Sequence, residues 1–155
     1  MGGMSALKDR LRTDLTAAMK AREELRASTL RMALTAITNA EVAGKSAKEL
    51  SDAEVVDVLS SEAKRRREAA TAFDEGDRPE RAERERAEAG VLADYLPTPL
   101  TDEEVAAIVA DAVVEAGAEG QGMKAMGRVM GLVAPRTKGR ADGGVVAAEV
   151  KRQLA

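Results

Sequence analysis

The chain is rich in alanine and almost free of aromatic side chains, and this composition restricts how it can fold. Alanine supplies 31 of its 155 residues, whereas the aromatic residues are Phe73 and Tyr95 alone. A core without bulky rings must be filled by small and aliphatic side chains, so its secondary-structure elements must approach one another closely. With 45% hydrophobic residues the chain has the composition of a folded protein. We therefore expect a thin, closely packed core.

Apolar residues recur at intervals of three or four positions, which is the spacing of amphipathic helices, and no segment shows the alternation of a strand. The sequence therefore predicts an all-α protein. The helices expected before Tyr95 run over residues 5–22, through residues 30–37 to near Gly44, over residues 51–76, and onward from about Asp77. Ser51, Asp77 and Thr101 each precede a glutamate by three positions, so each is expected to form a capping box.

Two prolines, Pro97 and Pro99, follow Tyr95 and forbid a continuous helix. They predict an N-terminal helical domain over residues 1–95 and a small three-helix domain over residues 96–155. The helices expected in the second domain run over residues 101–117, over residues 121–133 with an end imposed by Pro135, and onward from an N-cap at Asp142.

The absence of cysteine and histidine excludes disulfides and thiolate metal sites and removes the commonest general base. There is no phosphate-binding loop of the Walker type and no Ser-Ser-Lys arrangement of an amidase. We therefore expect no catalytic residue, no metal site and no cofactor. Neither a run of about 18 apolar residues nor a secretory leader is present, so we expect a cytoplasmic protein with no membrane contact.

Charge is distributed unevenly along the chain, whose net charge is −3. Residues 94–122 contain seven acids and no lysine or arginine, whereas residues 123–155 contain seven cations and two acids, a net charge of +5. Between Glu62 and Glu88, eight cations and nine acids are interspersed. We expect this stretch to form an exposed, solvated helical arm that includes residues 64–67, with a partner-binding ridge as the alternative.

The basic segment contains the candidate binding site. Its cations can converge on successive phosphates of an RNA, and free N–H groups at the start of the last helix would add partial positive charge. The predicted site consists of Arg128, Arg136, Lys138, Arg140, Gly143 and Gly144, with Gly139 allowing an unusual backbone conformation. The alternative is that the cations merely neutralise the neighbouring acidic helix over residues 101–116. A chain with two aromatic residues lacks a stacking platform, which favours recognition of folded RNA by shape.

Gly127 and Gly131 lie four residues apart on one predicted helix, where each costs about 1 kcal/mol relative to alanine. Close helix packing is one explanation, and the approach of an RNA backbone or a protein partner is the other. Met123, Met126 and Met130 are expected to fill the core beside them.

Several motifs resemble those of the GatB/YqeY family, in an order that spans nearly the whole chain. These are Tyr95-Leu-Pro97, Thr-Asp-Glu-Glu-Val from Thr101, Met126-Gly-Arg-Val-Met-Gly131, Pro135 and Lys138-Gly-Arg-Ala-Asp-Gly143. The N-terminal Leu-Lys-x-Arg-Leu and the basic third helix are similar to those of its stand-alone, YqeY-like members. Ala134 and Ala147 depart from the pattern, where methionine and asparagine are usual.

The resemblance implies a helical domain joined to a three-helix domain similar to the tail of the tRNA-dependent amidotransferase B subunit. That tail engages tRNA carrying the mischarged Glu or Asp, so tRNA or another structured RNA is the expected ligand here. The amidotransferase or the aminoacyl-tRNA machinery would be the protein partner. Two alternatives stay open: a protein-interaction scaffold that uses the charged arm, and a carbon–nitrogen ligase with glutamine as amido-N donor, as the family is commonly described.

Overall fold

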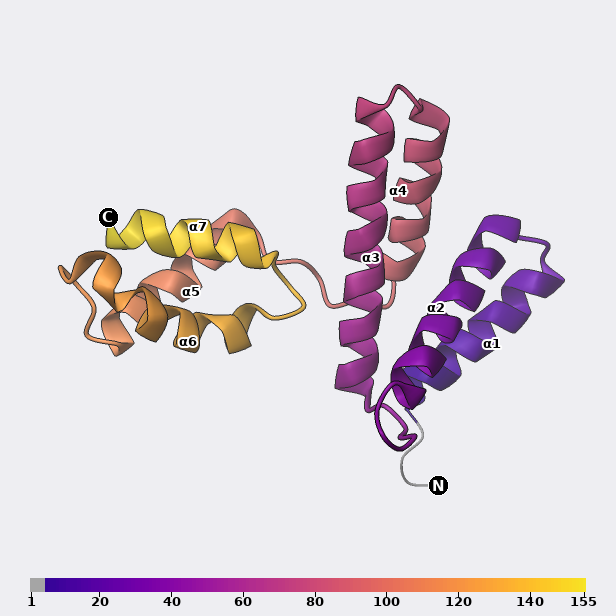
Figure 1. Ribbon diagram of the computed structural model, residues 1–155, viewed down its shortest axis with the longest axis horizontal. Helices are drawn as coiled ribbons and strands as arrows, with labels where there is room; N and C mark the ends of the chain where they lie inside the picture. The colour runs from indigo at the N-terminus through magenta and orange to yellow at the C-terminus, as the bar shows by residue number, and fades with distance from the viewer. Residues whose placement is uncertain (1–4) are drawn as a thin grey trace. The chain divides into compact units, whose positions relative to one another are not determined.

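The computed structural model describes residues 5–155, and within them the chain forms seven α-helices, one short 3-10 helix and no strand. The prediction of an all-α fold is confirmed. The chain divides between Leu96 and Pro97 into two compact units (Figure 1). Each unit has its own hydrophobic core.

The first unit consists of two helical hairpins (Figure 1). Helices α1 (Ala6–Lys20) and α2 (Glu24–Val42) form one, and α3 (Asp52–Glu75) and α4 (Pro79–Ala93) form the other. Aliphatic side chains from all four helices meet in one core, completed by Leu50 and by Tyr95 after α4. The buried residues on the helices are Leu11, Leu30, Ala33, Ile37, Val55, Leu59, Ala63 and Leu92.

Two of the three predicted capping boxes are present. The Ser51 hydroxyl accepts a hydrogen bond from the Glu54 N–H at 3.2 Å, and the Ser51 N–H donates to the Glu54 carboxylate at 3.1 Å. Thr101 forms the corresponding pair of bonds at the start of α5. The prediction for Asp77 is wrong, because the N-cap of α4 is Arg78, no side chain among residues 5–155 caps this helix, and Asp77 precedes the N-cap with a φ of 57°. Pro79 begins α4 instead, at a position where its missing N–H needs no partner.

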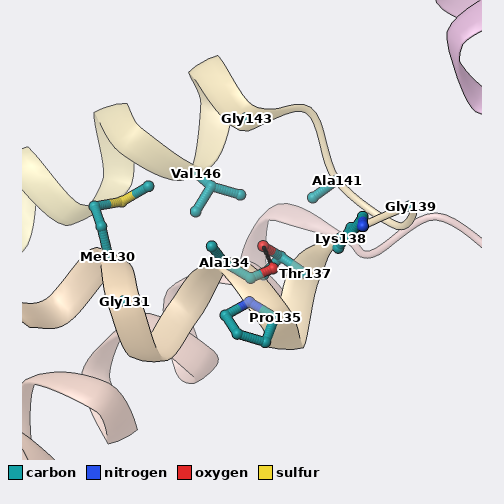
Figure 2. A pocket seen from close by; sticks show the side chains of 10 residues that line it. All are labelled: Met130, Gly131, Ala134, Pro135, Thr137, Lys138, Gly139, Ala141, Gly143 and Val146. Atoms are coloured by element: carbon teal, nitrogen blue, oxygen red, sulfur yellow. Dashed lines mark hydrogen bonds between the residues drawn. The ribbon is translucent and has the colours of Figure 1, made fainter. Parts of the chain in front are cut away.

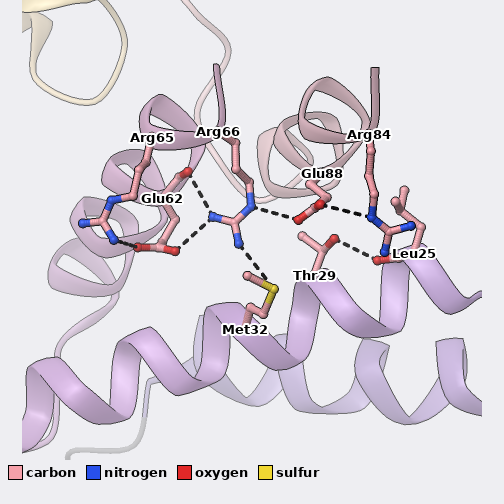
Figure 3. A network of polar contacts seen from close by, with 8 residues as sticks. All are labelled: Leu25, Thr29, Met32, Glu62, Arg65, Arg66, Arg84 and Glu88. Atoms are coloured by element: carbon pink, nitrogen blue, oxygen red, sulfur yellow. Dashed lines mark hydrogen bonds and ion pairs between the residues drawn. The ribbon is translucent and has the colours of Figure 1, made fainter. Parts of the chain in front are cut away.

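The expected solvated arm is also wrong in part, because Arg66 of α3 is buried in an ionic network (Figure 3). Its Nε donates to the Glu88 carboxylate at 3.3 Å, and its Nη1 donates to Glu62 Oε1 at 3.0 Å. Its Nη2 lies 3.7 Å from the Met32 sulfur of α2, so side chains of α2, α3 and α4 together enclose the guanidinium (Figure 3). Helices α3 and α4 also bury four alanines, whose small side chains allow close packing: Ala63, Ala70, Ala82 and Ala89.

Tyr95 closes the first unit directly before the proline-rich link. Its hydroxyl donates to Asp14 of α1 at 2.5 Å and accepts from Arg26 of α2 at 3.3 Å, while the Arg10 guanidinium lies 4.6 Å from the ring centroid. Burial of the phenol, together with the hydrogen bond to Asp14, raises the pKa of Tyr95 to about 12. The neutral phenol therefore fastens the end of α4 to both helices of the other hairpin.

The second unit contains α5 (Asp102–Glu115), the 3-10 helix η1 (Gly122–Ala125), α6 (Met126–Thr137) and α7 (Gly143–Leu154). Its core is built only from valine, alanine and leucine. The buried residues are Val105, Val109, Ala112, Val113, Ala118, Ala125, Val129, Val133, Val146, Val150 and Leu154. Met126 and Met130 pack against this core from its edge. Met123 is 49% exposed, so the prediction that it fills the core is wrong.

Replacing Arg66 with alanine is expected to lower the free energy of unfolding of the first unit by about 3 kcal/mol or more. The substitution leaves the buried Glu88 carboxylate with only the exposed Arg84 as a cation, at 3.5 Å, and breaking a buried pair from one side costs about that much. Urea titration followed by tyrosine fluorescence reports on this unit, because Tyr95 is the single tyrosine and the chain has no tryptophan.

The matched control is Arg65→Ala. Arg65 pairs with the same Glu62, but its side chain is 77% exposed, so its loss should change the unfolding free energy by no more than about 0.5 kcal/mol. Equal effects of the two substitutions would show that burial of Arg66 contributes nothing to stability.

Candidate functional site

The predicted cations lie on α6 and on the connection that leads from α6 to α7. Arg128 is in the first turn of α6, Arg136 is in its last turn, Lys138 follows the helix as its C-cap, and Arg140 lies in the connection. Arg136 was expected on a flexible connection beyond a helix end at Pro135. The structure corrects this, because α6 continues through Pro135 to Thr137.

The helix survives the proline because only one of its hydrogen bonds is lost. Pro135 has no N–H to donate to the carbonyl of Gly131, four residues earlier, and both residues lie on the exposed face of α6. Beyond the proline, the Lys138 N–H donates to the Ala134 carbonyl at 3.0 Å, and the Thr137 hydroxyl donates to the Val133 carbonyl at 3.1 Å. These bonds hold the last turn and fix the position of Arg136.

Arg136 forms a bidentate ion pair with Glu115 at the end of α5. Its Nη1 donates to Oε2 at 2.6 Å and its Nη2 donates to Oε1 at 2.8 Å. The hydrogen bond from Arg136 lowers the pKa of Glu115, so the carboxylate is ionised at neutral pH. For Arg136, the structure therefore shows the alternative interpretation, in which the cation neutralises an acid of the helix over residues 101–116.

Arg128 and Arg140 are held by neutral oxygens instead. Arg128 donates to the side-chain oxygen of Gln121, whose own amide group donates to the Gly117 carbonyl at 2.9 Å. Arg140 donates from Nε to the Thr98 carbonyl at 3.1 Å. A neutral acceptor orients a guanidinium without forming an ion pair with it. Glu104 lies close enough to Arg140 for the arginine to contribute, after hydrogen bonds from Thr101, to lowering the pKa of Glu104, but among residues 5–155 no carboxylate accepts a hydrogen bond from Arg140.

The start of α7 differs from the expectation in one respect. The N–H of Gly144 donates to the Asp142 carboxylate at 2.8 Å, so this amide is occupied by the helix cap and is not directed at a ligand. Asp142 is thus the N-cap that the sequence predicts. Gly143 is exposed in the first turn of α7, and Gly139 has a φ of 76°, the left-handed conformation expected of a glycine in this connection.

An open groove of about 660 Å³ lies between the last turns of α6 and the start of α7 (Figure 2). Its walls are mainly small or apolar, and Lys138 supplies its one charged side chain. The residues that line it are Met130, Gly131, Ala134, Pro135, Thr137, Lys138, Gly139, Ala141, Gly143 and Val146. Ala134, one of the two departures from the family pattern, contributes a methyl group to this wall.

Gly127 and Gly131 do not serve close helix packing. A Cβ atom added at either position would meet no atom within 4 Å, so the packing explanation is wrong. Both glycines lie on the exposed face of α6, and Gly131 lines the groove. The other explanation, that their missing side chains leave room for a ligand, stays a prediction.

Sequence reasoning did not single out Glu115, Gln121 or Thr98 as partners of the cations. Glu115 belongs to the acidic segment that was recognised, but the helical pattern alone does not say which of its acids faces α6. Among residues 5–155, no group of three or more aspartate, glutamate, histidine or cysteine side chains is placed to hold a metal ion. No helix in the same range is long and apolar enough to cross a membrane.

Comparison with known proteins identifies one family. A family model described as Yqey-like protein matches residues 8–154, which is nearly the whole chain. No curated protein matches the chain.

Replacing Gly131 with alanine is expected to stabilise α6 by about 0.5 to 1 kcal/mol. The new methyl group meets open space, the residue is helical, and alanine has the higher helix propensity. Native-state amide hydrogen exchange of α6 measures this directly, which is useful because the second unit has no aromatic reporter. Gly117→Ala is the control, since its φ of 63° should make the same change destabilising. If Gly131→Ala destabilised the protein, the conclusion that open space surrounds position 131 on α6 would be wrong.

Proposed function

The chain belongs to the YqeY-like family, and from this premise we propose that it is a non-catalytic module that binds tRNA or another structured RNA. The binding surface is α6 and the α6–α7 connection of the second unit. The module is accessory to tRNA-dependent amidation, and its protein partners are the amidotransferase or the aminoacyl-tRNA machinery.

The observation that carries the proposal is the way Arg128 and Arg140 are held. Each donates its hydrogen bond to an uncharged oxygen, so within the part of the chain that the structure describes neither guanidinium is held in a direct ion pair, although Glu104 acts on Arg140 through space. Lys138 lies between them in sequence and is exposed at the rim of the groove. Oriented cations on a glycine-rich connection suit the phosphates of a polyanion, which supply most of the affinity in nucleic-acid binding.

The residue types in this unit favour recognition by shape. Residues 97–155 contain no aromatic side chain, and Tyr95 in the first unit is buried against Asp14 and Arg10. Unpaired bases are usually recognised by stacking on aromatic rings, and this surface has none. Folded RNA has a backbone that presents phosphates at fixed positions. It is therefore the kind of ligand that best matches a cationic surface without aromatic side chains.

The double substitution Arg128→Gln with Arg140→Gln is expected to weaken the binding of total tRNA strongly at low salt. Four phosphate contacts would give a slope of roughly −3 in a plot of log affinity against log salt concentration. Each lost contact should make this slope shallower by about 0.8. Filter binding over a series of salt concentrations measures both the affinity and the slope. The variant slope should be shallower by about 1.6.

The control is the double substitution Lys151→Gln with Arg152→Gln at the end of α7. It removes the same charge from the same basic segment, but away from the connection. If the control weakens binding and flattens the slope as much as the Arg128 and Arg140 variant does, net charge alone is responsible and this surface is not the site. Absence of binding by the wild-type protein at low salt would refute RNA binding itself.

A further inference from the structure

Arg136 differs from the other two arginines of the proposed RNA-binding surface in the charge of its partner. Arg128 and Arg140 each donate to a neutral oxygen, whereas Arg136 donates to the two oxygens of the Glu115 carboxylate. The acidic segment over residues 94–122 thus neutralises this one arginine through a direct contact. The three arginines are therefore not equivalent towards an incoming anion.

The geometry of the pair is the geometry of a phosphate contact. Two parallel N–H donors of a guanidinium match the two oxygens of a carboxylate in the same way that they match two oxygens of a phosphate. In the Arg136 pair these distances are 2.6 and 2.8 Å. The side chains are 39% and 49% exposed, so solvent and solutes have access to both groups.

We propose that Glu115 occupies the phosphate-binding position of Arg136 in the RNA-free protein and competes with RNA for it. This inference rests on the proposed function. A backbone phosphate that reaches Arg136 must first displace the carboxylate, which then turns to solvent. Glu115 is therefore a residue that determines affinity without contacting the RNA, because its own contact with Arg136 is made only in the free state.

The size of the effect follows from the exposure of the pair. Exposed ion pairs shift an equilibrium constant by roughly 1.5-fold to 5-fold, and a bidentate pair lies towards the upper end. The exchange of carboxylate for phosphate is thus readily reversible. It also follows that Arg136 contributes less to net RNA affinity than Arg128 or Arg140 while Glu115 is present.

The substitution Glu115→Gln tests the inference, with total tRNA at low salt as the probe. It should tighten binding by roughly 2-fold to 5-fold, because Arg136 loses its directly paired carboxylate, while Asp111 continues to act on it through space in both proteins. Glu119→Gln is the matched control. It removes the same charge from the same acidic segment, at an exposed turn after α5, and should tighten binding by less than about 2-fold.

A double-mutant cycle separates competition from a general change in charge. In an Arg136→Gln background, Glu115→Gln should bring no further gain beyond that of Glu119→Gln, since the released cation is gone. Circular dichroism checks that each variant keeps its helix content.

Three results overturn the inference. If wild type binds tRNA but Glu115→Gln binds no more tightly than Glu119→Gln, the competition is wrong and the proposed function stands. If the gain from Glu115→Gln persists without Arg136, the carboxylate acts through another group. If no variant and no wild-type protein binds tRNA, the proposed function fails and the inference fails with it.

Discussion

Close approach of helices through small side chains is the constraint on which the rest of this structure depends. With two aromatic residues in the chain, the second unit fills its core with valine, alanine and one leucine, and the first unit relies on alanine along the contact of α3 with α4. In the first unit, side chains of α2, α3 and α4 enclose Arg66, which pairs with Glu62 and Glu88. In the second unit, Val129 and Val133 of α6 pack in the core, whereas Gly127 and Gly131 lie on the exposed face of the same helix.

The open face of α6 and the cationic connection after it are parts of one surface, but the surface is not uniform. A Cβ atom added at Gly127 or Gly131 would meet open space, the groove has mainly apolar walls, and the arginines differ in the charge of the acceptors that hold them. A count of cations in the sequence treats Arg128, Arg136 and Arg140 alike. Their hydrogen-bond partners separate them, because a carboxylate accepts from Arg136 whereas an amide oxygen accepts from Arg128 and a carbonyl oxygen accepts from Arg140.

Local signals in the sequence predicted the helices and most of their starts. Ser51 and Thr101 cap α3 and α5 as expected, since a capping box is made by residues three positions apart and needs no distant partner. The sequence-based predictions were wrong for one helix end, one helix cap and one core residue, because contacts with other elements or the local backbone conformation determined these features. Pro135 does not end α6 and Asp77 does not cap α4. Met123 lies in η1 and not on α6, and Ala125 is the residue of η1 that enters the core.

By itself, the sequence determined the all-α fold, the family, and the segment in which positive charge gathers, because these depend on periodicity, motif order and composition along the chain. Only the tertiary structure decided that Arg66 is buried, that Glu115 and not another acid meets Arg136, and that Gly127 and Gly131 have open space beside them. The physical reason is the same in each case. Helical spacing specifies which residues share a face, but the partner of that face comes from another helix, at a distance and rotation that side-chain packing sets.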